Sequence, residues 1–208
     1  MESAYVSVEQ VLDGLGDKVV DALTLMVAQV RDDMNVFRRT FPAWAADSTD
    51  RGWLNFAHDR AWAHLTRLLD DVDEVSFVDQ TPTREFYVGT LFRLRVKKHD
   101  AEGEVSSYPT LSAKMFMVQA PATFDGLEEV RLVAGYRWDA ELRRIGPPVI
   151  SLHDGADVIW VHELDEPADP QIVSAVPIVP AGGPTPPQIV VGDAIGEKTD
   201  TVQEGRSS

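Results

Sequence analysis

Apolar side chains recur every three or four residues through the first forty positions, which is the spacing of one face of an α-helix. Ser7 followed by Gln10 forms a capping box just before this stripe, and Pro42 follows its last member. We therefore expect one amphipathic helix over about residues 7–41. The stripe consists of Leu12, Leu15, Val19, Leu23, Met26, Val30, Met34, Phe37 and Phe41.

A second helical stripe follows a short connection that contains Trp44, and the polar run at 47–50 offers candidate caps. The spacing predicts a helix over about 49–72, and the short connection predicts that it packs antiparallel to the first helix. Gly14 and Gly16 each disfavour a helix by roughly 1 kcal/mol, so a break in the first helix is an open alternative. The second stripe consists of Leu54, Ala57, Ala61, Leu65, Leu68 and Val72.

Beyond the second helix the apolar period changes to two, which indicates β-strands with one buried face. The pattern predicts a long strand over 86–96, two more over 108–118 and 130–138, and a closing hairpin with Asp154-Gly155 at its turn. We therefore expect an α+β fold. An N-terminal antiparallel helix pair would pack on a mainly antiparallel β-sheet with meander order over about 75–164.

The composition changes at about residue 165, where the apolar alternation stops. The remaining segment holds 7 of the 13 prolines and more acids than bases, a composition typical of disorder. We expect a single domain over 1–165, followed by a disordered acidic Pro/Gly-rich tail over 166–208. The tetrapeptide Pro-Gln-Ile-Val occurs twice in this tail, at 170–173 and 187–190, either by chance or as strands that add to a sheet edge.

Charge and composition limit which partners and which cellular location the sequence predicts. The net charge of −15 is concentrated at the two ends of the chain, because 8 acids balance 8 bases within residues 51–100. Nucleic acids and anionic membranes bind clustered Lys and Arg, so both are disfavoured, whereas a protein partner, in particular a basic one, fits better. The sequence has no cysteine, no N-terminal signal pattern and no apolar run of about 18 residues, so we expect a cytoplasmic protein.

The sequence has no recognisable motif for enzyme chemistry. It contains no phosphate-binding loop, nucleophile elbow or zinc-binding His-Glu-x-x-His, and we expect no cofactor and no metal. By helical phase His58 falls inside the second stripe, so it is a candidate acid or base, or else a structural histidine. Asp59 is the candidate catalytic partner, but it lies too far round the helix to orient His58 without help from elsewhere. A pocket of an enzyme would then lie between the helix pair and the sheet, around His58, Trp62, Tyr136 and Trp138.

A second candidate surface follows from strand parity. Arg93, Arg95 and Lys97 alternate with apolar residues on one predicted strand, and Arg131 and Arg137 have the same parity on a later one. If the two strands are near neighbours, these residues form a basic, solvent-exposed sheet face in an otherwise acidic protein. This face is a candidate site for an acidic ligand or partner, RNA or the acidic tail, or it is only a solvated surface. RNA is disfavoured because these strands have no RNP-like aromatic pattern.

Two hypotheses of function remain. In the first, which the missing catalytic motifs favour, the chain is a non-catalytic soluble interaction protein. Examples are an acidic inhibitor, an antitoxin-like neutraliser or an accessory subunit that binds a protein partner. In the second, it is a small enzyme or ligand-binding domain that uses the pocket around His58.

Overall fold

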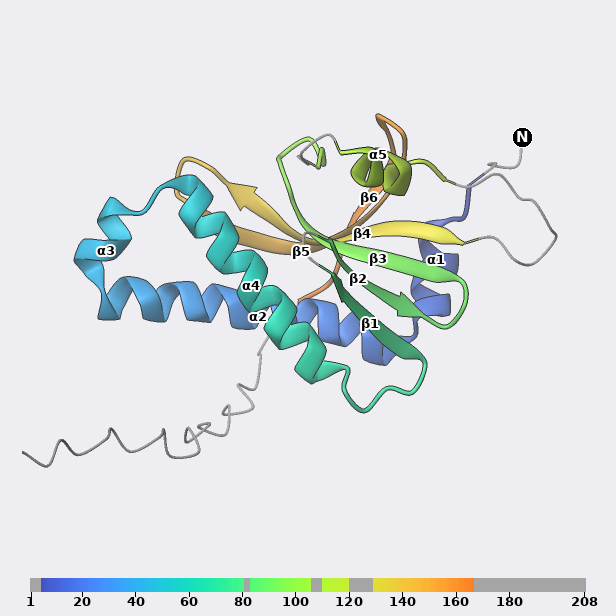
Figure 1. Cartoon of the computed structure of the whole chain (residues 1–208), viewed down its shortest axis with the longest axis horizontal. Coiled ribbons are helices and arrows are strands. Elements are labelled where there is room, and N and C mark those ends of the chain that lie inside the picture. Colours follow the sequence, from blue (N-terminus) through green and yellow to red (C-terminus); the bar gives the residue numbers. More distant parts are fainter. Residues whose placement is uncertain (1–4, 81–82, 106–109, 120–128, 167–208) are drawn as a thin grey trace, which may run out of the picture. The chain divides into compact units, whose positions relative to one another are not determined.

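The structure, a computed structural model, describes four stretches of the chain: residues 5–80, 83–105, 110–119 and 129–166. All of them belong to one compact unit, Met1–Pro170. Helices pack against a six-stranded sheet, so the fold is α+β as predicted (Figure 1). Apart from Glu166, the predicted tail over 166–208 lies outside the described residues.

A glycine divides the predicted N-terminal helix into two. Helix α1 spans Val8–Leu15 and α2 spans Asp17–Thr40. Gly16 between them has a φ of 77°, a left-handed value that glycine adopts readily and that cannot continue a helix. The predicted capping box is present, because the Gln10 N–H donates to Ser7 Oγ at 3.3 Å and the Ser7 N–H donates to Gln10 Oε1 at 2.9 Å.

The connection to the second long helix is itself helical. Helix α3 spans Pro42–Asp47, where the sequence predicts only a turn, and α4 spans Asp50–Leu68 with Thr49 as its N-cap. Helix α4 returns along α2, and this is the most extensive helix–helix contact among the described residues (Figure 1). The predicted antiparallel helix pair is therefore present.

The six strands of the sheet lie side by side in the order in which they occur in the chain. Every neighbouring pair is antiparallel except β3 and β4, which run parallel. The sheet is therefore mixed and mostly antiparallel. The simple meander is wrong at this one step, because a parallel pair needs a crossover connection. The strands are β1 Val75–Gln80, β2 Thr83–Val88, β3 Phe92–His99, β4 Val130–Asp139, β5 Arg144–Asp154 and β6 Asp157–Glu163.

The crossover between β3 and β4 contains helix α5, Leu111–Met117, where the alternation over 108–118 predicts a strand. Thr110 caps this helix, since its side-chain oxygen accepts from the Ala113 N–H at 3.1 Å. Phe116 is the only buried residue of α5. This part of the chain therefore covers the sheet instead of joining it as a strand.

The long strand predicted over 86–96 is a β-hairpin. Strand β2 ends at Val88, β3 begins at Phe92, and these two residues are cross-strand partners. Partners lie on the same face of a sheet, so the short turn between them leaves the alternation unbroken and hides the reversal in the sequence. Gly89, with a φ of 57°, opens that turn. The predicted closing hairpin is present as β5 and β6, with Gly155 in its turn.

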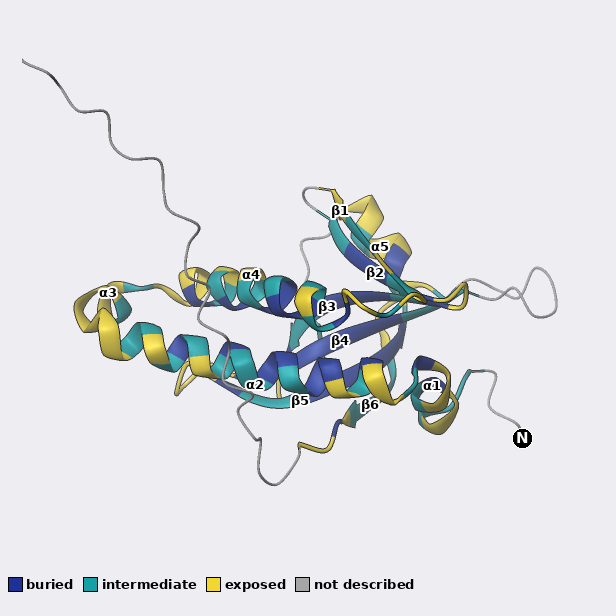
Figure 2. Cartoon of the chain, turned by 90° about the horizontal axis from the view of Figure 1, so that it is seen from below, coloured by how far each residue is buried: buried dark blue, intermediate teal, exposed yellow. Residues whose placement is uncertain are grey.

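The main core lies between α1, α2 and α4 and one face of the sheet (Figure 2). It combines the helical stripes with alternate strand residues such as Phe92, Leu94 and Leu132. Helix α5 lies on the opposite face, where Phe116 packs on Arg95, which alternates with the core residues of β3. Side chains on both faces of the central strands are therefore covered.

Candidate functional site

The five predicted basic residues share one face of the sheet. Strand β3 carries Arg93, Arg95 and Lys97, and its neighbour β4 carries Arg131 and Arg137. The register pairs Arg93 with Arg131, so these side chains project from the same face. Strand parity therefore groups these residues correctly.

This face is less open to solvent than predicted, because Arg95 is buried and the other four bases are only partly exposed. The Phe116 ring centroid of α5 lies 4.2 Å from the guanidinium carbon of Arg95, and Arg95 is only 7% exposed. Glu85 of β2, which is 2% exposed, lies between the arginines. It accepts hydrogen bonds from Arg95 Nε at 2.7 Å and from Arg93 Nε at 2.8 Å. An acid from the sheet itself therefore partners these two bases.

The carboxyl of Glu85 remains ionised in this setting. Burial raises its pKa, but the hydrogen bonds and charges of Arg95 and Arg93 outweigh that effect and hold the pKa below its ordinary value. Glu85 has the same parity as Tyr87, which lies opposite Arg93 across the hairpin. The sequence pattern could have found this acid if β2 and β3 had been recognised as separate strands.

The other bases hold the crossover in place. Arg131 Nη1 donates to two carbonyl oxygens at the end of α5, at 2.7 and 3.0 Å. Arg137 Nη1 donates to two carbonyl oxygens of the loop after β3, at 2.8 and 2.9 Å. Burial, together with the charge of Arg95, lowers the pKa of Lys97. These contacts give the basic face a structural role that residue parity alone does not predict.

A buried polar triplet lies on the same face, and the sequence pattern does not single it out. Ser151 Oγ of β5 lies 2.8 Å from His99 Nε2 of β3 and 2.8 Å from His153 Nε2 of β5. Ser151 Oγ also donates to the carbonyl oxygen of Val133 at 3.4 Å, so the hydroxyl has three partners inside the fold. None of the three side chains is more than 3% exposed. The hydroxyl is therefore part of an internal hydrogen-bond chain and is not presented to a substrate.

The structure does not assemble the residues around His58 into a catalytic group. His58 is partly exposed on α4, and burial is the main cause that lowers its pKa. Asp59 is directed to Arg84 instead, with which it forms an ion pair at 2.6 Å. The aromatic residues of the predicted pocket are buried members of the main core: Trp62, Tyr136 and Trp138.

The buried histidine of α4 is His64, whereas we predicted His58 inside the apolar stripe. His64 is 8% exposed, and its Nε2 lies 2.6 Å from Asp33 Oδ2 of α2. Arg67 Nη2 lies 2.9 Å from His64 Nδ1. Since an arginine can only donate, Nδ1 accepts and Nε2 carries the proton donated to Asp33. This pair joins α2 to α4.

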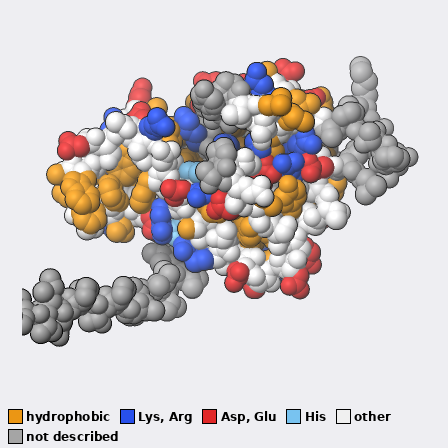
Figure 3. Space-filling model, viewed as in Figure 1, with side chains coloured by type: hydrophobic (Ala, Val, Ile, Leu, Met, Phe, Trp, Pro, Cys, Tyr) orange, Lys and Arg blue, Asp and Glu red, His pale blue; other side chains and the backbone are white. Residues whose placement is uncertain are grey.

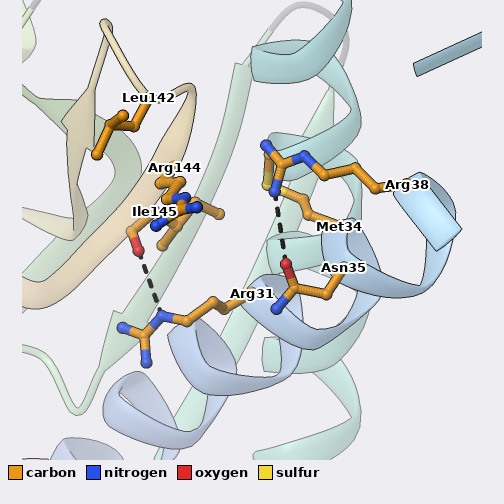
Figure 4. Close-up of a pocket in the computed structure, with 7 residues that line it drawn as sticks. All are labelled: Arg31, Met34, Asn35, Arg38, Leu142, Arg144 and Ile145. Carbon is orange, nitrogen blue, oxygen red and sulfur yellow. Dashed lines mark hydrogen bonds between the residues drawn. The ribbon is translucent and has the colours of Figure 1, made fainter. Parts of the chain in front are cut away.

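An open pocket lies beside the C-terminal half of α2, next to the turn between β4 and β5. Its volume is about 480 Å³. Side chains from α2 face side chains from the β4–β5 hairpin across it (Figure 4). Its lining contains three guanidinium groups and no carboxylate, so we call it the arginine pocket. It is lined by Arg31, Met34, Asn35, Arg38, Leu142, Arg144 and Ile145.

Arg31 fixes one edge of the arginine pocket. Its Nε and Nη2 donate to the carbonyl oxygens of Ile145 and Gly146 at 3.3 and 2.8 Å. Its Nη1 and Nη2 also bind the two carboxylate oxygens of Glu166, at 2.9 and 2.8 Å. The hydrogen bonds to Glu166 raise the pKa of Arg31. An acid of this chain is therefore already bound at the edge of the pocket.

The positive charges of the other two arginines, Arg38 and Arg144, are less well neutralised by neighbouring groups. The guanidinium of Arg38 lies 4.7 Å above the Trp53 ring and donates to the carbonyl oxygen of Arg143. Burial lowers its pKa, and the positive charge of Arg144 adds to this. Arg144 is exposed, and its side chain makes no hydrogen bond or ion pair with the part of the chain that the structure describes. The pocket therefore carries positive charge that an anionic group would stabilise.

Exposed apolar side chains gather over α3, at the same end of the described unit (Figure 3). Trp44 is 64% exposed, Val36 50% and Phe41 42%. The Phe41 and Trp44 rings stack with their centroids 4.9 Å apart. We call Val36, Phe41 and Trp44 the apolar tip. Leu142, also exposed, lines the arginine pocket.

Comparison with known proteins identifies no relative: no family model, curated protein or solved structure matches the chain. Among the described residues, no group of three or more His, Asp or Glu side chains is placed to hold a metal ion. No helix in the described ranges combines the length and hydropathy that a membrane span requires. The arginine pocket and the apolar tip are therefore the features of the described residues that bear on function.

Proposed function

We propose that the chain is a non-catalytic interaction protein. It binds an acidic segment of a protein partner in the arginine pocket and places apolar side chains of that segment on the apolar tip. The observation that carries this proposal is a pocket lined by three arginines beside a stacked, exposed aromatic pair, in a chain of net charge −15.

The pocket favours a carboxylate. A guanidinium binds a carboxylate through two parallel hydrogen bonds, as Arg31 does with Glu166. The guanidinium of Arg144 is exposed and forms no ion pair with an acid among the described residues, so it can bind a carboxylate in the same way. A volume of about 480 Å³ has room for one or two side chains of a peptide.

The apolar tip supplies the second half of the surface. Exposed clusters of large apolar side chains are uncommon on monomeric proteins and mark interaction sites. Trp, Arg and Tyr are the residues that most often dominate binding energy at protein interfaces. Trp44 and the pocket arginines meet this description, and Phe41 extends the apolar area.

Local charge also decides which partner fits. The net charge of the chain predicts a basic partner, but at 0.15 M salt charges more than about 8 Å apart are largely screened. A partner that docks at the arginine pocket is therefore affected mainly by the nearby guanidiniums and only weakly by the distant acids. We expect the segment of the partner that contacts the pocket to be acidic. The His64–Asp33 pair and the Ser151–histidine chain do not line the pocket, which supports a binding role over catalysis.

The test is capture of the partner from the cells that make this protein, with the full chain as bait. We expect Trp44→Ala combined with Arg144→Glu to reduce the captured partner at least tenfold. The matched control is Leu111→Ala combined with Lys114→Glu on α5, which removes an exposed apolar side chain and reverses a charge elsewhere. Equal capture by both double variants, or equal loss, would contradict the proposal.

A further inference from the structure

The two ends of α2 carry surfaces that complement each other. We propose that the apolar tip and the arginine pocket of one molecule dock on the opposite end of a second copy of this chain, so that copies associate head to tail. The second copy contributes an apolar pocket and the acidic turn between α4 and β1. This inference rests on the proposed function, because it names what occupies the same surface when no other partner does.

The first observation is a second open pocket, beside the N-terminal end of α2. It lies where the junction of α1 and α2 meets the α4–β1 and β2–β3 turns, and we call it the distal pocket. Its volume is about 500 Å³. Its lining includes buried apolar side chains, such as Leu15, Val88 and Phe92, and also Leu91, which is 41% exposed. The distal pocket is therefore an apolar site that an apolar side chain can enter.

The apolar tip presents the side chain that fits this pocket. Trp44 is 64% exposed and stacks on Phe41, with the ring centroids 4.9 Å apart. A volume of about 500 Å³ lies within the range of pockets that enclose small ligands, so the indole has room there. Aromatic side chains bury a large apolar area, and tryptophan in a pocket is a frequent anchor of protein interfaces. We therefore assign Trp44 of one copy to the distal pocket of the next.

The second observation is charge complementarity beside the two apolar surfaces. Residues 70–74 contain four exposed acids, of which Glu74 lines the distal pocket, and Val72 of the same turn also lines it. Among the described residues, the side chains of these acids make a single ion pair, between Asp71 and Lys18 at 3.9 Å. The turn between α4 and β1 is therefore an acidic segment with an apolar side chain, as the proposed function requires of a partner.

The arginine pocket supplies the opposite charge next to the apolar tip. Arg144 lines that pocket and Arg39 lies in the last turn of α2. Both are exposed, and their side chains make no hydrogen bond or ion pair with the residues that the structure describes. Two exposed acids of the same end, Asp47 and Glu141, do not line the pocket. A tip docked in the distal pocket therefore places these arginines close to the acids of residues 70–74.

The separation of the two surfaces requires a second molecule. Helix α3, which carries the apolar tip, lies at one end of α2, and α1 lies at the other (Figures 1 and 2). Helix α2 has 24 residues and is therefore about 36 Å long. No side chain spans that distance, so Trp44 cannot enter the distal pocket of its own molecule. A contact between unlike ends of two copies is heterologous and joins them head to tail.

Sedimentation velocity of the purified full chain tests this contact. The tip variant combines Trp44→Ala with Arg144→Glu, and the distal variant combines Leu91→Ser with Glu74→Lys. All four positions are exposed, so both variants should fold. We expect the wild type to associate as its concentration rises to about 1 mM, because contacts of this small kind are weak. Each variant should associate at least tenfold more weakly.

The matched control changes an exposed apolar side chain and a charge elsewhere, through Leu111→Ala with Lys114→Glu on α5. It should associate like the wild type. A wild type that stays monomeric over the whole range of concentration overturns the proposal, and so does a control that loses association. A distal variant that associates like the wild type also overturns it, because that result places tip against tip.

Mixing the two variants tests the direction of the contact. The tip variant keeps its distal pocket and the distal variant keeps its tip, so an equimolar mixture should form pairs with one chain of each kind and nothing larger. With the isotope label on the tip variant, we expect NMR shifts at Gly16 and Gly89 of the distal pocket and none at Leu142 of the arginine pocket. With the label on the distal variant, Leu142 should shift instead. A mixture that does not associate, or that shifts the same end in both cases, overturns the proposal.

Partner capture separates this inference from the proposed function. Capture that depends on Trp44 and Arg144, by a chain that stays monomeric, supports the function and overturns the docking of a second copy. Association through both ends, with capture that ignores the tip variant, supports the docking and overturns the function. If both hold, an excess of the tip variant lowers capture by the wild-type bait several-fold, whereas a chain with all four substitutions does not. Unchanged capture in that excess overturns docking at the shared surface.

Discussion

Acidification from pH 7 to pH 5 is expected to destabilise the folded chain mainly through His99. This residue is 0% exposed, and its Nε2 lies 2.8 Å from Ser151 Oγ. Burial lowers its pKa to about 4, and the nearby His153 and Arg137 act in the same direction, while Asp100 opposes them. In the unfolded chain the same group titrates near 6.5. The folded state therefore holds His99 neutral.

The sign and size of the effect follow from this difference. A lower pKa in the folded state means that the unfolded chain binds more protons, so stability falls as the pH drops below about 6.5 and stops falling near 4. The pKa of His99 in the folded state is about 2.5 below its value in the unfolded chain, which corresponds to about 3 kcal/mol of the free energy of unfolding. About 2 kcal/mol of this free energy is lost between pH 7 and pH 5. Burial lowers the pKa of His153 as well, which adds to the loss. Glu85, whose pKa is lowered, contributes only at more acidic pH, below about 4.5.

The assay is urea unfolding of the wild type and two variants at pH 7, 6 and 5. We expect the wild type to lose about 2 kcal/mol over this range and His99→Gln to lose much less. Val133→Ala is the matched control, because Val133 is buried beside Ser151 on the same face and does not titrate. It should be less stable by about 2 kcal/mol at every pH, with the slope of the wild type. If His99→Gln keeps the wild-type slope, the histidine is not the titrating group and the reasoning fails.

Two further predictions concern the sheet. Glu85→Gln should reduce the free energy of unfolding by about 3 kcal/mol or more, because it leaves the buried guanidinium of Arg95 without a counter-charge and that of Arg93 with Glu129 alone, and combination with Arg95→Met should recover part of the loss. A loss below about 1 kcal/mol in urea unfolding would contradict this burial argument. Gly135→Ala should prevent stable pairing of β3 with β4, since an added Cβ would lie 1.8 Å from the carbonyl oxygen of Lys97. Circular dichroism should show a large fall in Tm, whereas Gly52→Ala, which has room on α4, should change stability by no more than about 1 kcal/mol.

Local periodicity determined much of this fold. The capping box at Ser7, the stripe of α2, the parity of the bases on β3 and β4 and the β5–β6 hairpin were all predictable from the sequence. Each depends on residues a few positions apart, whose spacing fixes which side chains share a face. The glycine break at Gly16 belongs to the same class, because the conformation it needs is local.

Helical phase did not identify the buried histidine of α4, because two histidines lie at equal angles from the centre of the apolar stripe. At about 100° per residue, His58 and His64 lie about 60° on either side of the centre of the α4 stripe, so phase alone cannot choose between them. The choice depends on the neighbouring helix. Asp33 of α2 accepts a hydrogen bond from His64 Nε2 at 2.6 Å, and this contact exists only once α2 and α4 pack together.

Tertiary structure alone decided the site. The parallel pairing of β3 with β4 requires a crossover, and the crossover brings α5 over bases that parity predicts to be exposed. The arginine pocket joins Arg38 of α2 to Arg144 of β5, and no sequence period links positions so far apart. Pairing over such distances is set by how whole apolar faces are buried together, because that burial supplies most of the stabilising free energy. The sequence therefore determined which faces exist, while the packing of those faces decided which polar groups meet and which remain free to bind.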